Sequence, residues 1–157
     1  MKTADLVDAH GEELQFCNLP FLKLGMRQAF CGPIATIKCF EDNALLKAEL
    51  QKPGEGRVMV VDGGASNRVA LLGDQIATIL RDNGWAGIII NGAVRDSAEI
   101  NQMDVAVFCL SLTPKKSVKD GAGRAGIPVQ FGGVSFAPGA YLCADQDGVL
   151  VSARDLR

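Results

Sequence analysis

The sequence contains one histidine, His10, among its 157 residues, and none of its cysteines form a CxxC pair. A multi-histidine zinc site is therefore excluded. A Ser-His-Asp or Cys-His catalytic arrangement would depend on one side chain near the N-terminus, so we do not expect one. The cysteines are odd in number and three of them lie in apolar surroundings, so we expect reduced, partly buried thiols. They are Cys17, Cys31, Cys39, Cys109 and Cys143.

The sequence also has little net charge and no long apolar run. A formal net charge of −2 supplies no broad cationic field for nucleic acid or for an anionic membrane. No segment approaches the roughly 20 apolar residues that span a bilayer, and the acidic start lacks the core of a signal peptide. We therefore expect a cytoplasmic protein with no direct binding to nucleic acid or membrane.

The composition is that of a folded protein with many turns. Hydrophobic residues make up 48% of the chain, charged residues 22%, and there are 18 glycines. A chain of this length can bury one substantial core and matches the common size of one domain. We predict a single domain over residues 1–157.

The first third predicts two helices and a strand region. Apolar residues at helical spacing predict a short helix within residues 3–13. The segment 28–40 is rich in Ile, Thr, Phe and Cys, and Gly32-Pro33 within it predicts either one bent strand or two consecutive strands. Asp42-Asn43 then predicts the cap of a helix that runs through Glu49.

The middle of the chain predicts a crossover unit. Residues 56–62 form a continuous apolar run that ends in Gly63-Gly64, as in a strand buried on both faces. Apolar residues at spacings of three and four predict a helix over 72–80, and residues 85–90 predict a second buried strand. In such a unit the two strands are parallel neighbours.

Further strands are predicted over residues 105–112 and, with glycine and proline turns between them, over 129–151. The fold class is therefore α/β, with a parallel crossover unit and a mainly β C-terminal third.

Residues 121–126 match the pattern GxGxxG, but a dinucleotide site needs a strand directly before the glycines and a helix directly after them. Here the preceding residues are polar and rich in lysine, and a strand follows, so we predict a flexible connection. Lys115, Lys116 and Lys119 nearby are interpreted as a solvated cluster, with contact to an anion as the alternative.

The residues that indicate chemistry lie between Asp62 and Asp96. The glycine turns after the two parallel strands meet at one edge of the sheet, where ligands bind in open α/β structures. Gly73, Asp74, Gln75 and Ile76 open the intervening helix, whose free N–H groups favour an anion such as a carboxylate.

Arg95 and Asp96 follow Asp74 at a distance that allows all three to reach this edge. An arginine binds a carboxylate or polarises a keto oxygen, and the two carboxylates could hold a hard cation such as Mg²⁺. The residues alone leave an alternative open, in which Arg95 and Asp96 form surface ion pairs and Asp74 is an ordinary acid at a helix start.

Several segments resemble the RraA-like family, which comprises regulators of ribonuclease E activity and class II 4-hydroxy-4-methyl-2-oxoglutarate aldolases. They are Lys38-Cys39-Phe40-Glu41-Asp42-Asn43, Val60-Val61-Asp62-Gly63-Gly64, Asn91-Gly92-Ala93-Val94-Arg95-Asp96 and Phe131-Gly132-Gly133-Val134. The resemblance covers nearly the whole chain. It implies an α/β fold related to swivelling β/β/α domains and a homotrimer with its site near a subunit interface.

The aldolases of this family carry an aspartate, twenty intervening residues and Arg-Asp, which this sequence matches with Asp74, Arg95 and Asp96. The resemblance implies that Asp96 binds a divalent cation (Mg²⁺ or Mn²⁺) while Asp74 positions a water on it. It also implies that Arg95 and the backbone of Gly73, Asp74, Gln75 and Ile76 bind a small 2-oxo acid.

The implied reactions are retro-aldol cleavage of 4-hydroxy-4-methyl-2-oxoglutarate to pyruvate and decarboxylation of oxaloacetate, which share a pyruvate enolate. One alternative is a protein that binds and inhibits ribonuclease E. Another is a structural trimer without a ligand.

Overall fold

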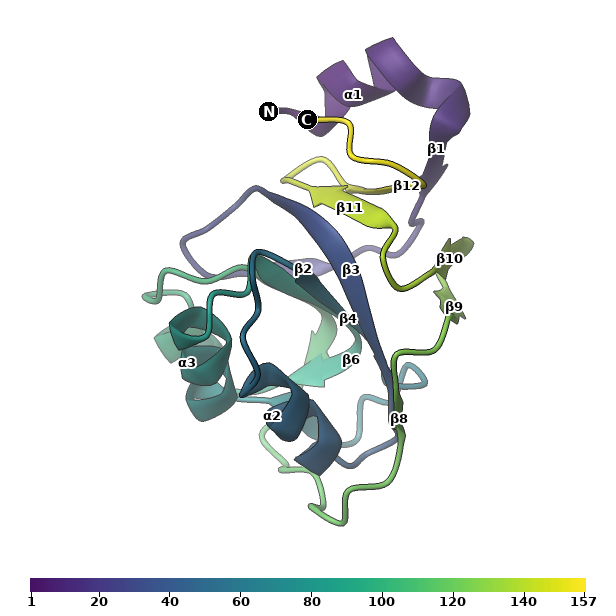
Figure 1. Cartoon of the computed structure of the whole chain (residues 1–157). Helices are drawn as coiled ribbons and strands as arrows, with labels where there is room; N and C mark the ends of the chain where they lie inside the picture. Colours follow the sequence, from purple (N-terminus) through teal and green to yellow (C-terminus); the bar gives the residue numbers. More distant parts are fainter.

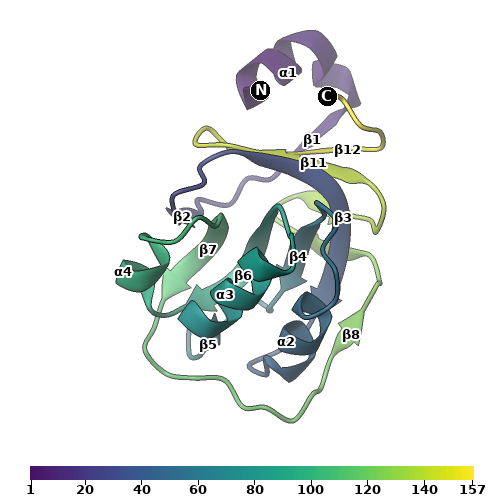
Figure 2. The same cartoon turned by 60° about the vertical axis from the view of Figure 1, so that its left-hand side comes forward.

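Four parallel strands, in the order β3, β4, β6 and β7, form the centre of the computed structural model, which describes residues 1–157 (Figure 1; β7 is labelled in Figure 2). The sheet continues with antiparallel strands at both edges, β11, β12 and β1 beyond β3, and β2 beyond β7. None of the helices has the length and apolar character that crossing a bilayer requires. The α/β class with a strand-rich C-terminal part is confirmed.

The helices are α1 (Thr3–His10), η1 (Gly11–Glu13), α2 (Ala44–Leu50), α3 (Asp74–Asp82) and α4 (Ser97–Ile100). The strands are β1 (Leu14–Phe16), β2 (Leu22–Leu24), β3 (Phe30–Lys38), β4 (Val58–Asp62), β5 (Ala70–Leu72), β6 (Gly87–Val94), β7 (Val107–Leu112), β8 (Arg124–Ala125), β9 (Val129–Phe131), β10 (Val134–Phe136), β11 (Tyr141–Ala144) and β12 (Val149–Ser152).

The predicted crossover unit is present, because β4 and β6 are parallel neighbours with Val58 opposite Gly87 and Asp62 opposite Asn91. Residues of β4 alternate between two cores. Met59 and Val61 face the core beneath the helices, while Val58 and Val60 face the core beneath β9 and β10. Burial on both faces explains why this strand is apolar without interruption.

The segment predicted as one bent strand or two is the single strand β3, which changes partner part-way. Its first residues pair with β11, up to Pro33 opposite Tyr141, and Ile34 onward pairs with β4. A side chain at Gly32 would collide with the carbonyl oxygen of Gly56, so the chain needs glycine there. The long strand therefore joins the central sheet to the layer that carries both termini (Figure 2).

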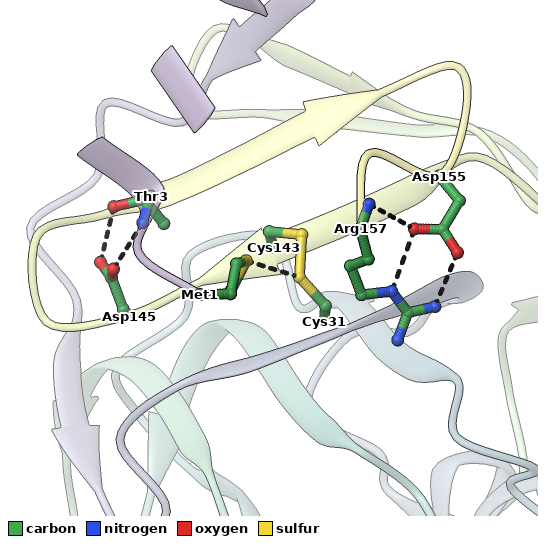
Figure 3. The surroundings of a disulfide bond; sticks show 7 residues. All are labelled: Met1, Thr3, Cys31, Cys143, Asp145, Asp155 and Arg157. Atoms are coloured by element: carbon green, nitrogen blue, oxygen red, sulfur yellow. Dashed lines mark hydrogen bonds and ion pairs between the residues drawn. A yellow bond between two sulfur atoms is a disulfide. The ribbon is translucent and has the colours of Figure 1, made fainter. Parts of the chain in front are cut away.

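The prediction that all five cysteines are reduced was wrong for Cys31 and Cys143, which form a disulfide (Figure 3). The two residues stand opposite each other in the β3–β11 pair, with Cα atoms 4.2 Å apart. Such register partners are 112 positions apart in sequence, so no local pattern indicates them. Disulfides are uncommon in the cytosol, and the cytoplasmic location therefore stays a prediction.

The other three cysteines are free. Cys39 and Cys109 are buried, and burial raises the pKa of each thiol to about 12. For Cys39 the nearby carboxylates of Asp42 and Asp62 add to this increase in pKa. Neither thiol is a nucleophile at neutral pH, because only the thiolate reacts.

Candidate active site

The predicted residues meet in one pocket at the start of α3, of about 90 Å³. This is room for several waters or a small organic acid. All six residues predicted from the sequence lie in its wall, and five residues from elsewhere in the chain complete it. The lining is Gly73, Asp74, Gln75, Ile76, Arg95 and Asp96, together with Asn43, Lys47, Ala70, Lys116 and Lys119.

Two strand ends bring these residues together. β5 runs beside the end of β6, with Leu72 opposite Val94, and the N–H of Arg95 donates to the carbonyl oxygen of Leu72 at 3.0 Å. Gly73 directly after β5 and Arg95 directly after β6 therefore stand next to each other. The twenty residues between Asp74 and Arg95 are the rest of α3, the connection 83–86 and β6, which return the chain to the same edge of the sheet.

Asp96 has a left-handed backbone conformation, with φ 62° and ψ 38°. It precedes α4, but its side chain does not cap that helix. Its Oδ2 accepts a hydrogen bond instead from the N–H of Asp74, at 3.0 Å. A non-glycine residue in this region marks a locally constrained backbone, and here it accompanies a carboxylate placed at the start of α3.

The start of α3 offers two further donors. No hydrogen bond within the chain engages the N–H groups of Gln75 and Ile76, since the first helical bond runs from Ala77 to Gly73. Free N–H groups at the positive end of a helix favour an anionic group. A carboxylate of a ligand fits this position.

Arg95 is half-buried and has no carboxylate partner in the chain. Its one side-chain hydrogen bond is a long contact of 3.4 Å from Nη1 to the carbonyl oxygen of Pro114. The alternative in which Arg95 and Asp96 form ion pairs is therefore wrong. Most of the donors of the guanidinium remain available for a ligand.

The segment predicted as a flexible connection is held by Asp42. Oxygens of its buried carboxylate accept hydrogen bonds from the N–H groups of Asp120, Gly121 and Ala122, at 2.9 to 3.2 Å, and from Ala44 at 3.1 Å. Burial opposes ionisation, but these donors outweigh it and hold the pKa of Asp42 below its usual range. No helix follows the glycines, since β8 pairs with β3, so the Rossmann interpretation is excluded as predicted.

Sequence reasoning did not find Asn43 and Lys47, and it interpreted Lys116 and Lys119 as a solvated cluster. All four line the pocket. The Nδ2 of Asn43 donates to the carbonyl oxygen of Leu71 at 3.2 Å, which ties the start of α2 to β5. The adjacent polar pair Asp42-Asn43 was an available signal, but it was interpreted as a helix cap and as part of a family segment, without a place in the site.

The donor set suits a hard cation that keeps most of its ligands from water or substrate. No group of three or more His, Cys, Asp or Glu side chains converges anywhere in the chain, so a closed protein cage is absent. Asp96 and Asp74 supply carboxylate oxygens in the pocket. Mg²⁺ is held in this way in many enzymes, by one or two carboxylates together with waters and substrate oxygens.

A mixed α/β sheet with an arginine, two carboxylates and a free helix start at one edge has the layout of a small-ligand site in an α/β protein. The family model described as RraA-like, Aldolase/RraA, matches residues 3–151. The chain belongs to the RraA-like family.

Three relatives carry three different names. A protein of Aromatoleum aromaticum, provisionally named 4-hydroxy-4-methyl-2-oxoglutarate aldolase, is 50% identical over 155 residues, which are 99% of this chain and 98% of the relative. A Geobacillus kaustophilus structure, named as an S-adenosylmethionine:2-dimethylmenaquinone methyltransferase, is 51% identical with a TM-score of 0.97, covering 99% of this chain and 97% of that one. The RNA-processing inhibitor RraA of Thermus thermophilis is 39% identical with a TM-score of 0.96, covering 100% and 95%.

Proposed function

We propose that this protein is a divalent-metal-dependent lyase that cleaves 4-hydroxy-4-methyl-2-oxoglutarate to pyruvate and decarboxylates oxaloacetate. The observation that carries the proposal is the convergence of Asp74, Arg95 and Asp96 in one pocket, with Arg95 free of any carboxylate partner. The name of the Aromatoleum aromaticum relative supports the aldolase assignment.

The pocket binds the 2-oxo acid end of the substrate. The C1 carboxylate accepts hydrogen bonds from the N–H groups of Gln75 and Ile76, which have no partner in the chain. The guanidinium of Arg95 donates to the C2 keto oxygen. Asp96 would hold a divalent cation, with Asp74 as the second carboxylate of the same pocket.

Arg95 then stabilises the charge that develops as the bond between C3 and C4 breaks. In the aldol substrate the C4 hydroxyl loses its proton and becomes the keto group of one pyruvate, while the electron pair moves to C3 and gives the enolate of the second. In oxaloacetate the same bond breaks and CO₂ leaves, so both reactions form one enolate, which takes a proton at C3. When bound, the cation supplies Lewis-acid stabilisation of the enolate charge.

The test is pyruvate release from each substrate with Mg²⁺ or Mn²⁺ and with EDTA. We expect EDTA, Arg95→Ala and Asp96→Asn each to reduce turnover by at least about 100-fold, the scale of losing one oxyanion donor. Arg81→Ala is the matched control, because Arg81 is exposed at the other end of α3 and pairs only with Asp82. Undiminished turnover by Arg95→Ala would disprove the assignment.

The pocket supports the lyase better than the methyltransferase activity in the name of the Geobacillus relative. Its volume of about 90 Å³ is below the roughly 300–1,000 Å³ of pockets that enclose drug-sized ligands, a class that includes S-adenosylmethionine. The polar lining also contains only two hydrophobic residues. Calorimetric titrations of the wild type and of Arg95→Ala with S-adenosylmethionine should therefore give the same result, with no binding that depends on this pocket.

The name of the Thermus relative supports a second candidate, binding and inhibition of ribonuclease E. A pull-down at moderate salt tests it, and the Asp96→Asn variant separates the two functions. It should lose lyase activity and keep any nuclease binding, because Asp96 lies inside the pocket. If neither the wild type nor Asp96→Asn binds ribonuclease E, this candidate function is contradicted.

We also propose a homotrimer. Two exposed apolar side chains close to the pocket, Phe40 and Val118, support an interface there, and their segments are joined by the hydrogen bond from the N–H of Val118 to Glu41. Light scattering coupled to gel filtration measures the mass, and a monomer would refute the proposal.

A further inference from the structure

Three lysines in the pocket wall have no carboxylate partner. Lys47 comes from α2, and Lys116 and Lys119 come from the segment between β7 and β8. None of them takes part in an ion pair of the chain, whereas Lys52, five residues after Lys47, contacts Glu49 at 2.8 Å. The pocket therefore holds ammonium groups that the protein itself does not neutralise.

The backbone that carries Lys116 and Lys119 is fixed on both sides. The N–H of Ala70 donates to the carbonyl oxygen of Lys115 at 2.7 Å, and the buried hydroxyl of Ser117 donates to the carbonyl oxygen of Ala70 at 2.8 Å. On the other side the N–H of Asn43 donates to the carbonyl oxygen of Val118 at 3.2 Å, and Asp42 holds the residues that follow Lys119. These hydrogen bonds hold the backbone of both lysines at the pocket, in contrast to a surface loop without such contacts.

The charges in the pocket do not balance. Its lining has four cationic side chains and two carboxylates, a net charge of +2 before any metal binds. Binding of a monocarboxylic 2-oxo acid uses only the start of α3 and Arg95, and it leaves the lysines without a counter-ion. The substrate proposed above has a second carboxylate on the far side of the scissile bond.

We propose that Lys116 and Lys119, with Lys47 at the rim, bind this distal carboxylate and select dicarboxylic over monocarboxylic 2-oxo acids. The inference rests on the proposed function for the orientation of the substrate. Once the C1 carboxylate is at Gln75 and Ile76, these lysines are the cationic groups left in the wall. They are specificity determinants, and they take no part in breaking the bond.

Binding of two unreactive probes tests the proposal independently of catalysis. 2-Oxoglutarate carries its second carboxylate at the position of the distal one and cannot undergo the cleavage, and 2-oxopentanoate has a methyl group in that place. Calorimetry in the presence of Mg²⁺ compares the wild type with Lys116→Gln/Lys119→Gln. The control is Lys115→Gln, since Lys115 is exposed on the same segment but does not line the pocket.

We expect the wild type and the Lys115→Gln control to prefer 2-oxoglutarate by roughly 100-fold, about tenfold for each charge-assisted contact. The double variant should lose that preference while its affinity for 2-oxopentanoate stays within about twofold. Lys119→Arg should retain most of the preference, because the charge remains. The lysines are exposed, so the variants should fold as the wild type does, and their melting temperatures check this.

Unchanged preference in the double variant, or no preference in the wild type, would overturn the inference. An equal loss for both probes would also overturn it, because it would show a general effect on the pocket. Failure of the proposed function has a different signature: lysine-dependent binding of 2-oxoglutarate in a protein that releases no pyruvate from either proposed substrate.

Discussion

Replacing Gly73 by alanine should reduce the activity of the pocket without unfolding the protein. Gly73 precedes α3 with φ −131° and ψ −165°, which is extended backbone that alanine adopts readily. A Cβ there would lie 2.6 Å from Oδ2 of Asp96 and 3.3 Å from Cγ of Arg95. The carboxylate must therefore withdraw by roughly 0.5–1 Å to reach ordinary contact distance.

The expected change in stability is small, whereas the expected change in activity is large. The withdrawal breaks the hydrogen bond from Asp74 to Asp96, which in this half-buried site contributes about 1 kcal/mol. Alanine offsets much of that loss, because it reduces the entropy of the unfolded chain by about 0.4–1 kcal/mol. The melting temperature should thus stay within about 4 °C of the wild type.

Activity should fall much more, by roughly 10- to 100-fold in kcat/KM for pyruvate release, because a displacement near 1 Å at a reacting centre costs about that much. The Mg²⁺ concentration for half-maximal activity should rise as well. Gly148→Ala is the control, since a Cβ at Gly148 meets nothing within 4 Å. Full activity of Gly73→Ala with an unchanged metal requirement would refute the role given to the position of Asp96.

Four further predictions concern stability. Asp42→Asn should lower the free energy of unfolding by about 3 kcal/mol, because an amide cannot accept every N–H bond that the buried carboxylate accepts; equal denaturant midpoints would contradict this. The pKa of Asp42 is lowered in the folded protein, so its contribution to stability is full above the ordinary carboxyl pKa and is lost as the pH falls through the pKa of the folded state. In acid titrations, Asp42→Asn should therefore lose less stability than the wild type below about pH 4. Dithiothreitol should lower the melting temperature of the wild type, because opening a disulfide loop on the order of 100 residues reduces the free energy of unfolding by up to about 4–5 kcal/mol. The melting temperature of Cys31→Ala/Cys143→Ala should not respond to dithiothreitol. Asp145→Asn should release α1 to limited proteolysis, because Asp145 accepts hydrogen bonds from the N–H and the hydroxyl of Thr3, both at 2.7 Å; an unchanged cleavage pattern would count against that anchor.

The crossover unit could be predicted from the sequence because its signals are local. The unbroken apolar run of β4 reports a strand buried on both faces, and the spacing of apolar residues in α3 reports one buried helix face. The short strands β1, β2, β5 and β8 were not predicted. Two or three residues carry no measurable periodicity, and such strands exist only because a neighbouring strand supplies their partners.

Half of the pocket followed from the sequence in the same way. Asp74, Arg95 and Asp96 lie on one crossover unit, whose geometry brings its two loops to the same edge of the sheet. Their spacing and their chemistry indicated the convergence, and the resemblance to the family selected it over the alternative of surface ion pairs. The metal and the reaction remain predictions, drawn from the resemblance to the family.

Only the tertiary structure decided the other half. Lys116 and Lys119 line the pocket because Asp42 fixes the segment that carries them. Asp42 lies 78 to 80 positions before the N–H groups that it binds. Cys31 meets Cys143 because β3 and β11 pair in one register. Sequence periodicity reports what each segment buries, whereas contacts between distant segments depend on strand register and packing, which no single segment encodes.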